Sequence, residues 1–437
     1  MLAGTRASPG NEWLECLYPT MGSIKQNYRT RILTSLAAAG QPAWDALVAA
    51  QSAPNPFLSY AFLHALHESG SAADDTGWQP QYLTLWIEDD GHGDGDVHRG
   101  NAERDPARAG STGSAGSGSL GRLAAALPMY AKFHSYGEYV FDWAWADAYK
   151  RNGLDYYPKL LSAIPFTPVS GNRLLAIDDQ ARAALVDALQ GVQQASALSS
   201  THILYPTEAE AKQLEAAGFL LRKGVQFHWQ NEGYDSFEQF LSTLEMKKRK
   251  NIRAERRKVA EAGITLRQLR GEDSTEADWR FFKRCYDQTY QAHWSTPYLN
   301  LDFFRRIGET MPHNLLLVIA EREGKSIASS LLVYDDQALY GRYWGCIEQH
   351  PCLHFETAYY QPLEFCIAHR IPAFEGGAQG EHKMARGFLP QQTWSAHWLA
   401  HPAFSDAVER FLAQEGKGIL SYMDELNERN PFKTGLP

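Results

Sequence analysis

Residues 314–344 read NLLLVIAEREGKSIASSLLVYDDQALYGRYW, and the expected architecture follows outward from this segment. Apolar, β-branched and aromatic residues fill three short runs, at 314–321, 326–334 and 338–344. The polar links between them, Arg-Glu-Gly-Lys and Asp-Asp-Gln, have the length and composition of hairpin turns. The segment therefore predicts three consecutive antiparallel strands.

Helices are expected before and after these strands in the sequence. Apolar residues recur at helical spacing over 276–291 and 301–309 before them and over 354–368 after them. A short apolar strand is expected at 372–374. In the N-terminal half, helices and strands also alternate, at 179–197, 202–205, 207–217 and 225–230. The order predicts an α/β (α+β) protein with mixed, mostly antiparallel sheets flanked by helices.

Two segments differ in composition from the rest of the chain. Residues 1–27 mix Gly, Ser, Pro and Asn with scattered apolar side chains and are expected to be poorly ordered, and 91–121 hold nine glycines and no aromatic residue. The second segment cannot bury enough apolar surface to offset the entropy of ordering it, so it is expected to be a disordered loop. With a boundary near 231–235, we expect an N-terminal domain at 28–230 and a C-terminal domain at 231–437.

Composition excludes several classes of protein. The 437 residues are 44% hydrophobic and 21% charged, as in globular proteins, and the formal net charge of −9 is not that of a polycation. Five cysteines without Cys-x-x-Cys spacing argue against a zinc ribbon or a disulfide framework. No signal peptide and no integral membrane segment is recognisable, so a cytoplasmic location is expected.

The richest chemistry lies in residues 372–398, PAFEGGAQGEHKMARGFLPQQTWSAHW. Its glycines permit a close backbone approach to a ligand, and a carboxylate, an imidazole and two cations follow within six residues. The alternative is a polar turn whose charges pair with one another. The candidate residues here are Gln379, Gly380, Glu381, His382, Lys383 and Arg386.

Two further segments suggest binding surfaces. Residues 247–258 hold eight Lys or Arg and one Glu, which favours contact with phosphate, although a solvated charged face is the simpler alternative. Residues 133–157 hold nine aromatics, which suggests a groove for a sugar, a base or an acyl chain, although core packing of a strand and the following turn is the simpler alternative. The candidates are Lys247, Arg249, Lys250 and Arg253 in the first segment and Tyr139, Trp143 and Trp145 in the second.

Two helices, three antiparallel strands, a helix and another strand form the order of the GNAT acetyltransferase core. Several motifs resemble the FemAB-like predicted N-acyltransferases, relatives of the peptidoglycan-bridge aminoacyltransferases that contain two tandem GNAT-like domains. The motifs are KKRKNIRAERR (247–257), LYGRYWGC (339–346), LHFETAYYQ (353–361), FEGGAQGEHKMARGF (374–388), NPFLSYAFLHALHESG (55–70), HSYGEYVFDWAWADAY (134–149) and QFHWQNEGY (226–234).

This resemblance implies an N-acyltransferase whose active site lies in the C-terminal domain. The acyl donor would lie where the strand at 340–344 and the strand at 372–376 diverge, and an amine would attack it directly. His382 is the first choice for the base, with Glu381 as the alternative. Lys383 and Arg386 would hold phosphate or the oxyanion. His354 and Glu356 would meet an anion at a helix start, and only one of Arg342 and Tyr343 would face the cleft, because side chains alternate along a strand.

The donor and the acceptor stay open. The segment GCIEQHPC (345–352) lacks the glycine pattern that cradles the pyrophosphate of CoA in GNAT enzymes, so both acyl-CoA and aminoacyl-tRNA remain candidates as co-substrate. The aromatic groove would help to bind an amine acceptor, either a small molecule or one like a peptidoglycan precursor. No tightly bound cofactor and no metal is expected, and the sequence does not indicate the oligomeric state.

Two other classes of protein would use some of the same residues. A metalloenzyme could use His354, Glu356, Glu381, His382, His397 and His401, but no established metal-binding spacing is present. A non-catalytic module for an anionic glycan or RNA would use the basic and aromatic segments.

Overall fold

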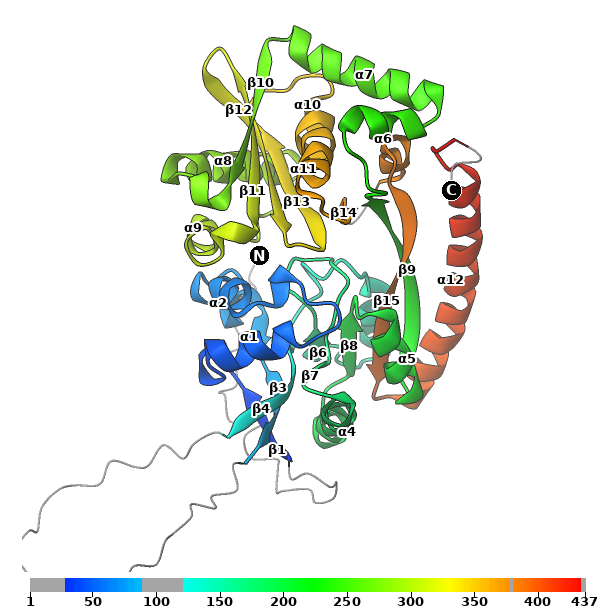
Figure 1. Ribbon diagram of the computed structural model, residues 1–437. Helices are drawn as coiled ribbons and strands as arrows, with labels where there is room; N and C mark the ends of the chain where they lie inside the picture. Colours follow the sequence, from blue (N-terminus) through cyan, green and yellow to red (C-terminus); the bar gives the residue numbers. More distant parts are fainter. Residues whose placement is uncertain (1–27, 89–120, 378–379, 434–437) are drawn as a thin grey trace, which may run out of the picture.

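The computed structural model describes residues 28–88, 121–377 and 380–433. The predicted extension at 1–27 and nearly all of the predicted insertion at 91–121 lie outside the described residues. The described chain forms one four-stranded sheet and one eleven-stranded sheet with helices on their faces (Figure 1). The predicted fold class is confirmed.

The three expected strands of the C-terminal half are present, and a fourth precedes them. The four strands β10 to β13 pair antiparallel in chain order. Hairpin turns join β11 to β12 and β12 to β13. The elements of this half are α6 (Phe237–Thr243), α7 (Met246–Glu261), β10 (Ile264–Arg270), α8 (Glu276–Ala292), α9 (Leu301–Thr310), β11 (Leu315–Arg322), β12 (Lys325–Tyr334), β13 (Ala338–Cys346) and β14 (Ala373–Glu375).

The helix between β13 and β14 is interrupted. It consists of α10 (Leu353–Phe355), a π-helical turn (Glu356–Tyr360) and α11 (Gln361–His369). Pro362 lies in the first turn of α11 and has no N–H to donate to the preceding turn. A wider π turn accommodates the missing hydrogen bond, and such turns are frequent at functional sites.

The N-terminal half supplies the smaller sheet and one end of the larger one. Strands β1, β3, β4 and β7 form the four-stranded sheet, and β8, β6, β5 and β2 continue the large sheet. The elements are β1 (Tyr28–Leu33), α1 (Gln41–Ala49), α2 (Tyr60–Glu68), β2 (Trp78–Pro80), β3 (Tyr82–Ile87), β4 (Arg122–Leu127), β5 (Tyr130–Lys132), α3 (Trp143–Arg151), β6 (Lys159–Ser162), β7 (Leu175–Ala176), α4 (Asp179–Ala195), β8 (Ser200–Leu204) and α5 (Glu208–Ala216).

Two long strands join the halves. β9 (Leu220–Gln230) pairs with β14 of the C-terminal half, and β15 (Leu389–Leu399) pairs with β8 of the N-terminal half. β9 and β15 also pair with each other, and α12 (Pro402–Glu428) runs alongside both (Figure 1). Each half thus donates a strand to the sheet of the other, while the division into domains at 28–230 and 231–437 stays a prediction.

Apolar contacts also fix the halves against each other. The ring of Phe62 on α2 packs edge-on against Phe303 on α9 at 5.5 Å, and Phe57 packs against Tyr340 of β13 at 5.1 Å. Buried aromatic pairs contribute about 0.5–1.5 kcal/mol beyond their burial. The N-terminal half is therefore held directly against the strand on which the candidate site is built.

Candidate active site

The two strands expected to diverge do so. β13 and β14 run parallel and pair only through Ala338↔Ala373, Leu339↔Phe374 and Tyr340↔Glu375. β14 ends there, whereas β13 continues to Cys346. Among the described strands, none pairs with this continuing edge of β13 on the β14 side. The edge is therefore available to a ligand at the position that the resemblance predicts for the acyl donor.

A β-bulge at the point of divergence corrects one prediction. On β12, Leu331 pairs with Tyr343 and Leu332 pairs with Gly341, so Arg342 is an extra residue on β13. An extra residue breaks the alternation of side chains. Both neighbours therefore reach one acceptor: Arg342 Nη2 lies 2.6 Å and Tyr343 Oη 3.3 Å from the carbonyl oxygen of Phe166. The alternation expected of these two side chains is therefore absent, while their facing the donor cleft stays a prediction.

Phe166 belongs to the N-terminal half and is held firmly. Its φ of 58° is unusual for a side chain other than glycine. Its ring stacks on Tyr298 at 4.8 Å, and a Cβ at Gly137 would lie 2.6 Å from it, so only glycine fits there. The N-terminal half thus sets the position of the Arg342 guanidinium.

Glu375 ends β14 at the point of divergence and is missing from the residues predicted from sequence. Its side chain is 15% exposed, its Oε2 has no hydrogen-bond partner among the described residues, and His228 Nε2 lies 3.9 Å away. Burial raises the pKa of Glu375 to about 8, against the opposing charges of Arg342 and Arg173. Burial lowers the pKa of His228 to about 4, so that imidazole is neutral near pH 7. The sequence signal that could have identified Glu375 is a carboxylate directly after a short apolar strand.

Lys383 lies beside Gly376, the residue that follows Glu375. It is 2% exposed, and its Nζ donates a 2.8 Å hydrogen bond to the carbonyl oxygen of Gly377. A Cβ at Gly376 would lie 3.1 Å from the Lys383 side chain, which explains the small residue at this place. Burial lowers the pKa of Lys383 to about 8. Carboxyl and amine groups with pKa values near working pH are suited to proton transfer.

His382 and His354 lie together further along the open edge. Their rings are 6.4 Å apart, and His382 Nε2 lies 3.2 Å from the hydroxyl of Tyr359. Burial, Arg386 and Lys383 lower the pKa of His382, and burial lowers that of His354 to about 4. His354 also lines a cavity of about 510 Å³ at the end of β13. The other residues lining this cavity include Thr289, His293, Trp344, Cys346, Cys352 and Phe355.

Three predicted residues have internal partners instead. Glu381 is exposed and bonds to Tyr422 and Arg429, at 2.8 and 3.0 Å, on the surface of α12. Arg386 is buried and donates to Glu255, to the hydroxyl of Tyr360 and to the carbonyl of His382. Glu356 is buried in an ion pair with Arg256 at 3.0 Å. Gly380 has a φ of 119°, a backbone conformation that favours glycine, while its predicted part in binding stays a prediction, and Gln379 lies outside the described residues.

The basic segment forms α7, and only part of it is available to a ligand. Arg249 donates to the carbonyl of Leu244 at 2.9 Å, and Arg253 pairs with Glu238. Lys247 and Lys250 are exposed and have no hydrogen bond or ion pair with any described residue. The predicted phosphate contact is thus restricted to part of the helix surface.

The aromatic segment is a loop followed by α3, not the strand and turn that its composition suggests. Trp145 is buried against His397 at 4.9 Å, which is core packing. Trp143 is 42% exposed, and the carbonyl of Tyr139 accepts a hydrogen bond from Tyr205 at 3.1 Å. Of the three, only Trp143 presents a largely open ring.

The N-terminal half has no equivalent gap in its described part. β6 and β8 also run parallel and pair over three residues, but β6 ends at Ser162 and β8 at Leu204, so neither continues past the pairing as β13 does. Lys159 of β6 is fully buried and bonds to Glu138 and Ser135, each at 2.8 Å, and pairs with Asp142. Lys159 thus has its partners within the protein and offers no free cation to a ligand.

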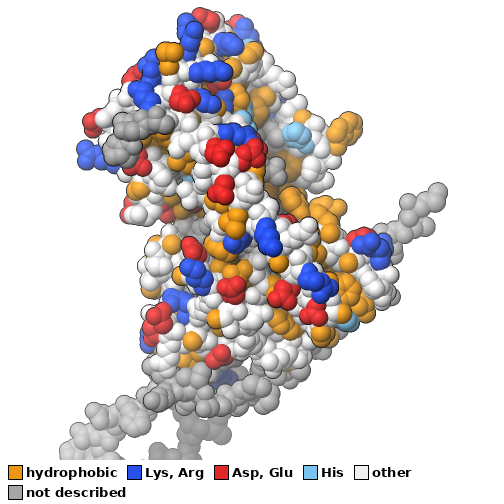
Figure 2. Space-filling model, turned by 90° about the vertical axis from the view of Figure 1, so that its right-hand side faces the viewer, with side chains coloured by type: hydrophobic (Ala, Val, Ile, Leu, Met, Phe, Trp, Pro, Cys, Tyr) orange, Lys and Arg blue, Asp and Glu red, His pale blue; other side chains and the backbone are white. Residues whose placement is uncertain are grey.

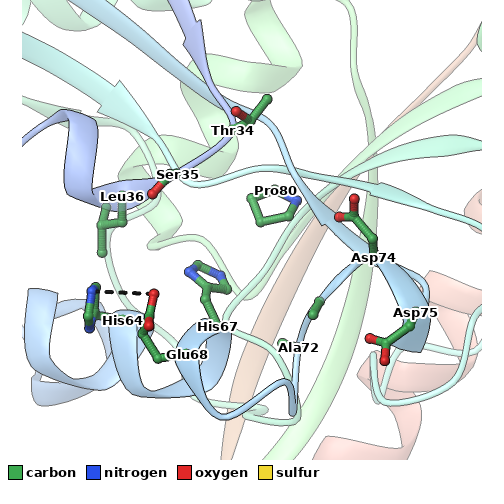
Figure 3. Close-up of a pocket in the computed structure, with 11 residues that line it drawn as sticks. Thr34, Ser35, Leu36, His64, His67, Glu68, Ala72, Asp74, Asp75 and Pro80 are labelled. Carbon is green, nitrogen blue, oxygen red and sulfur yellow. Dashed lines mark ion pairs between the residues drawn. The ribbon is translucent and has the colours of Figure 1, made fainter. Parts of the chain in front are cut away.

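A separate cavity of about 410 Å³ lies beside α2 in the N-terminal half (Figure 3). Its walls include Glu68, Asp74 and Asp75 and no Lys or Arg. His67 at this cavity lies 3.0 Å from the hydroxyl of Tyr82 and 3.2 Å from that of Tyr130, and burial lowers its pKa to about 4. The imidazole is therefore fixed and neutral, which is a structural role.

Neither a metal centre nor a membrane span is found in the part of the chain that the structure describes. No group of three or more His, Cys, Asp or Glu side chains there could hold a metal ion. His397 instead bonds to His202 and Ser395, at 2.8 and 2.9 Å. No helix among the described residues has the length and apolar character needed to cross a bilayer.

Comparison with solved structures finds proteins similar to this chain. The crystal structure of FemX matches with 11% identity over 87% of this chain and 100% of its own, at a TM-score of 0.51, which shows a shared fold. A tandem GNAT protein of the clavulanic acid pathway matches with 11% identity, 86% and 99% coverage and a TM-score of 0.42. L-PGS from Bacillus licheniformis matches with 12% identity, 66% and 86% coverage and a TM-score of 0.42.

Comparison with curated proteins finds no match. A family model, FemAB_like, described as peptidoglycan biosynthesis/recognition, matches residues 35–434. The chain therefore belongs to the FemAB-like family, whose description is peptidoglycan biosynthesis/recognition, and it shares its fold with FemX.

Proposed function

We propose that this protein transfers an acyl or aminoacyl group from an activated carrier to the amine of an acceptor related to a peptidoglycan precursor. The family match supports the class of reaction and of acceptor. The observation that carries the proposal is the divergence of β13 and β14 after Tyr340 and Glu375, with a largely unpaired carboxylate at that point. The carrier is either the thiol of CoA or the 3′ end of a tRNA.

Glu375 is the proposed base. An amine attacks the carbonyl carbon of the donor, the new N–C bond forms, and the nitrogen becomes positively charged. Glu375 takes the surplus proton, the tetrahedral intermediate breaks its bond to the carrier, and Glu375 returns the proton to the departing sulfur or oxygen. A carboxyl group whose pKa is raised to about 8 can both accept and return a proton near neutral pH.

Arg342 and Lys383 are proposed to stabilise the oxyanion. Arg342 lies in the bulge of β13 and Lys383 is buried beside Gly376, so both place positive charge next to the point of divergence. In a site shielded from water such donors typically contribute about 10²–10³-fold in rate each. Tyr343 shares the acceptor of Arg342 and positions it.

His382 and His354 are proposed to line the donor cleft, beside the 510 Å³ cavity at the end of β13. Both imidazoles have lowered pKa values and so are predominantly neutral at pH 7. They present hydrogen-bonding edges and flat faces to the carrier rather than charge. His382 remains the second candidate for the base.

A ligand screen tests the proposal and separates the two carriers. The thermal stability of the purified protein is measured with acetyl-CoA, longer acyl-CoAs, free CoA, aminoacyl-tRNA and uncharged tRNA. A ligand that binds only the folded state stabilises it by about 2.7 kcal/mol at one hundred times its dissociation constant. Stabilisation by acyl-CoA or by aminoacyl-tRNA identifies the donor. No stabilisation by any of them would argue against a transferase.

A matched variant shows whether a binding ligand uses the proposed site. Gly341→Val places a branched side chain on β13, where even a Cβ would lie 3.5 Å from the backbone of Glu375. It should abolish the shift while the protein remains folded. Gly416→Val in α12, where a Cβ would meet no atom within 4 Å, serves as the control.

A further inference from the structure

One face of α7 bears a row of cations that the proposed transfer does not use. Lys247, Lys250, Arg257 and Lys258 are exposed and have no hydrogen bond or ion pair with a described residue. Lys250 and Arg257 are about two turns apart, and Lys247 and Lys258 are about three turns apart, so the members of each pair lie above one another. Lys247 and Lys250 are three positions apart and therefore neighbours on the helix surface, so all four residues lie on one side of the helix. Ile252 and Val259, 2% exposed, mark the opposite, buried side. We call these four residues the basic row.

Helix stability explains only part of the basic row, because Lys258 lies in the last turn of α7, where a cation is favourable, but Lys247 lies in the first. The first turn of α7 contains Met246, Lys247 and Lys248 and no acidic residue. Cations at a helix N-terminus oppose the helix dipole and cost about 0.3–1 kcal/mol each. The rest of the protein is acidic, since the chain has a net charge of −9. Figure 2 shows Lys and Arg side chains gathered at the top of the molecule, where Figure 1 places α7.

A groove of about 590 Å³ lies beside the basic row, between α6, α7 and β10. Phe237, Leu241 and Leu266 give it apolar walls, and Arg257 lines it as well, together with two ion pairs, Arg253 with Glu238 and Arg256 with Glu356. Next to the basic row, the side chain of Met246 is 75% exposed. The surface therefore combines positive charge with apolar contacts.

We propose that this face of α7 docks on an anionic phospholipid surface. Lipid phosphates complement the basic row, and an acyl or glycerol segment fits the apolar walls of the groove. Among the residues of α7 none is aromatic, and single-stranded RNA is bound chiefly by stacking its bases on aromatic rings. An apolar groove offers nothing to the phosphates of an RNA duplex. This inference does not depend on the proposed transfer.

Vesicle sedimentation with the full-length protein tests it. The protein should sediment with vesicles of phosphatidylcholine and phosphatidylglycerol and stay in solution with phosphatidylcholine alone. Each cation near an anionic surface contributes roughly five-fold in affinity. Binding should decline strongly between low salt and about 0.5 M salt, because salt screens surface charges.

Two quadruple variants with the same change in charge locate the contact. Changing Lys247, Lys250, Arg257 and Lys258 to Glu should abolish sedimentation with the vesicles. Changing Lys150, Lys325, Arg410 and Lys417 to Glu, four exposed cations elsewhere, should leave most of it. Met246→Asp should weaken it by several fold. Thermal melts confirm that each variant folds.

Three results would overturn the inference. The first is the absence of sedimentation with anionic vesicles, and the second is equal loss in both quadruple variants. The third is binding of tRNA through the basic row without binding of vesicles, which would make this face an RNA contact.

Discussion

Arg342, on β13 of the C-terminal half, donates a 2.6 Å hydrogen bond to the carbonyl oxygen of Phe166 in the N-terminal half. The carbonyl is held by an unusual backbone conformation and a ring stacked on Tyr298. A guanidinium at the proposed oxyanion position is thus oriented by a residue far away in the sequence. The site is built from both halves of the chain.

Arg342→Ala should lower turnover by about 10²-fold, because a preorganised donor to the developing oxyanion is lost. Loss of a hydrogen bond to a charged group costs about 1.5–3 kcal/mol, so the protein should still fold. Tyr343→Phe keeps the guanidinium and should lower turnover far less. Turnover and thermal stability are measured for both. Equal activity of the Arg342→Ala variant and the wild type would remove this residue from the mechanism.

Glu375→Gln should stabilise the protein and inactivate it. The folded-state pKa of Glu375 is raised to about 8 from an ordinary value of 4.5, so the folded protein binds this proton more tightly than the unfolded chain. Stability is therefore lost as pH rises from about 4.5 to about 8. Replacing the carboxyl by an amide should recover about 2–3 kcal/mol near pH 7.

The activity of the wild type should rise with pH through about 8 as Glu375 ionises. The Glu375→Gln variant should be slower by at least about 10²-fold and no longer show this rise. Glu364→Gln, on the surface of α11, serves as the control. A Glu375→Gln variant that is both active and no more stable than the wild type would contradict the assignment.

The sequence predicts best where structure is local. The strands β11 to β13 were predictable because apolar runs and short turns specify hairpins by themselves. The exchange of β9 and β15 was not, because it depends on pairings between distant segments such as Ala396 with Ile203. The aromatic segment was misread as a strand because the same rings also suit a loop and a helix that pack onto the core.

The same difference between local patterns and distant pairings decides which residues of the candidate site were predictable. His382 and Lys383 were predictable as neighbours of a glycine-rich turn. The bulge at Arg342 was not, because it is a property of the pairing between β12 and β13. Charges that looked free in the sequence, such as Arg386 and Glu356, have partners on α7 that only the fold brings near.

His382→Ala tests the alternative base. The side chain is exposed on one side, and its hydrogen bond is to Tyr359, so its removal should cost about 1 kcal/mol of stability or less. If His382 only lines the donor cleft, KM for the donor should rise several fold while the turnover rate changes little. A turnover rate that falls by about 10²-fold or more, together with loss of the pH dependence seen in the wild type, would transfer the role of base from Glu375 to His382.

The cross-strand pair His202 and His397 predicts loss of stability in acid. Their Nδ1 atoms are 2.8 Å apart, and burial lowers the pKa of His202 to about 3 and that of His397 well below its ordinary value. Both are neutral in the folded state, whereas the unfolded chain binds protons below about pH 6.5. The stability is thus complete above pH 6.5 and declines as pH falls toward the folded-state values.

At pH 5 the cost should be about 2 kcal/mol for each of these two histidines. Thermal melts between pH 7.5 and 5 measure the decline. His202→Gln should be less stable at pH 7.5 but should show a shallower decline, whereas His401→Gln, at an exposed position, should keep the slope of the wild type. The same slope in all three proteins would show that the pair does not control acid stability.

The exchanged strands predict that neither half folds alone. Residues 28–230 would expose both edges of β9 and the β15 edge of β8, and residues 231–437 would lack the partner of β14 and β15. Unpaired strand edges favour aggregation. Each half expressed alone should be insoluble or lack a cooperative melt, and co-expression should give a soluble complex. A chain cut after folding, at a protease site placed between Asn231 and Asp235, should remain associated. Two halves that each melt cooperatively as monomers would show that the strand pairings between them are dispensable.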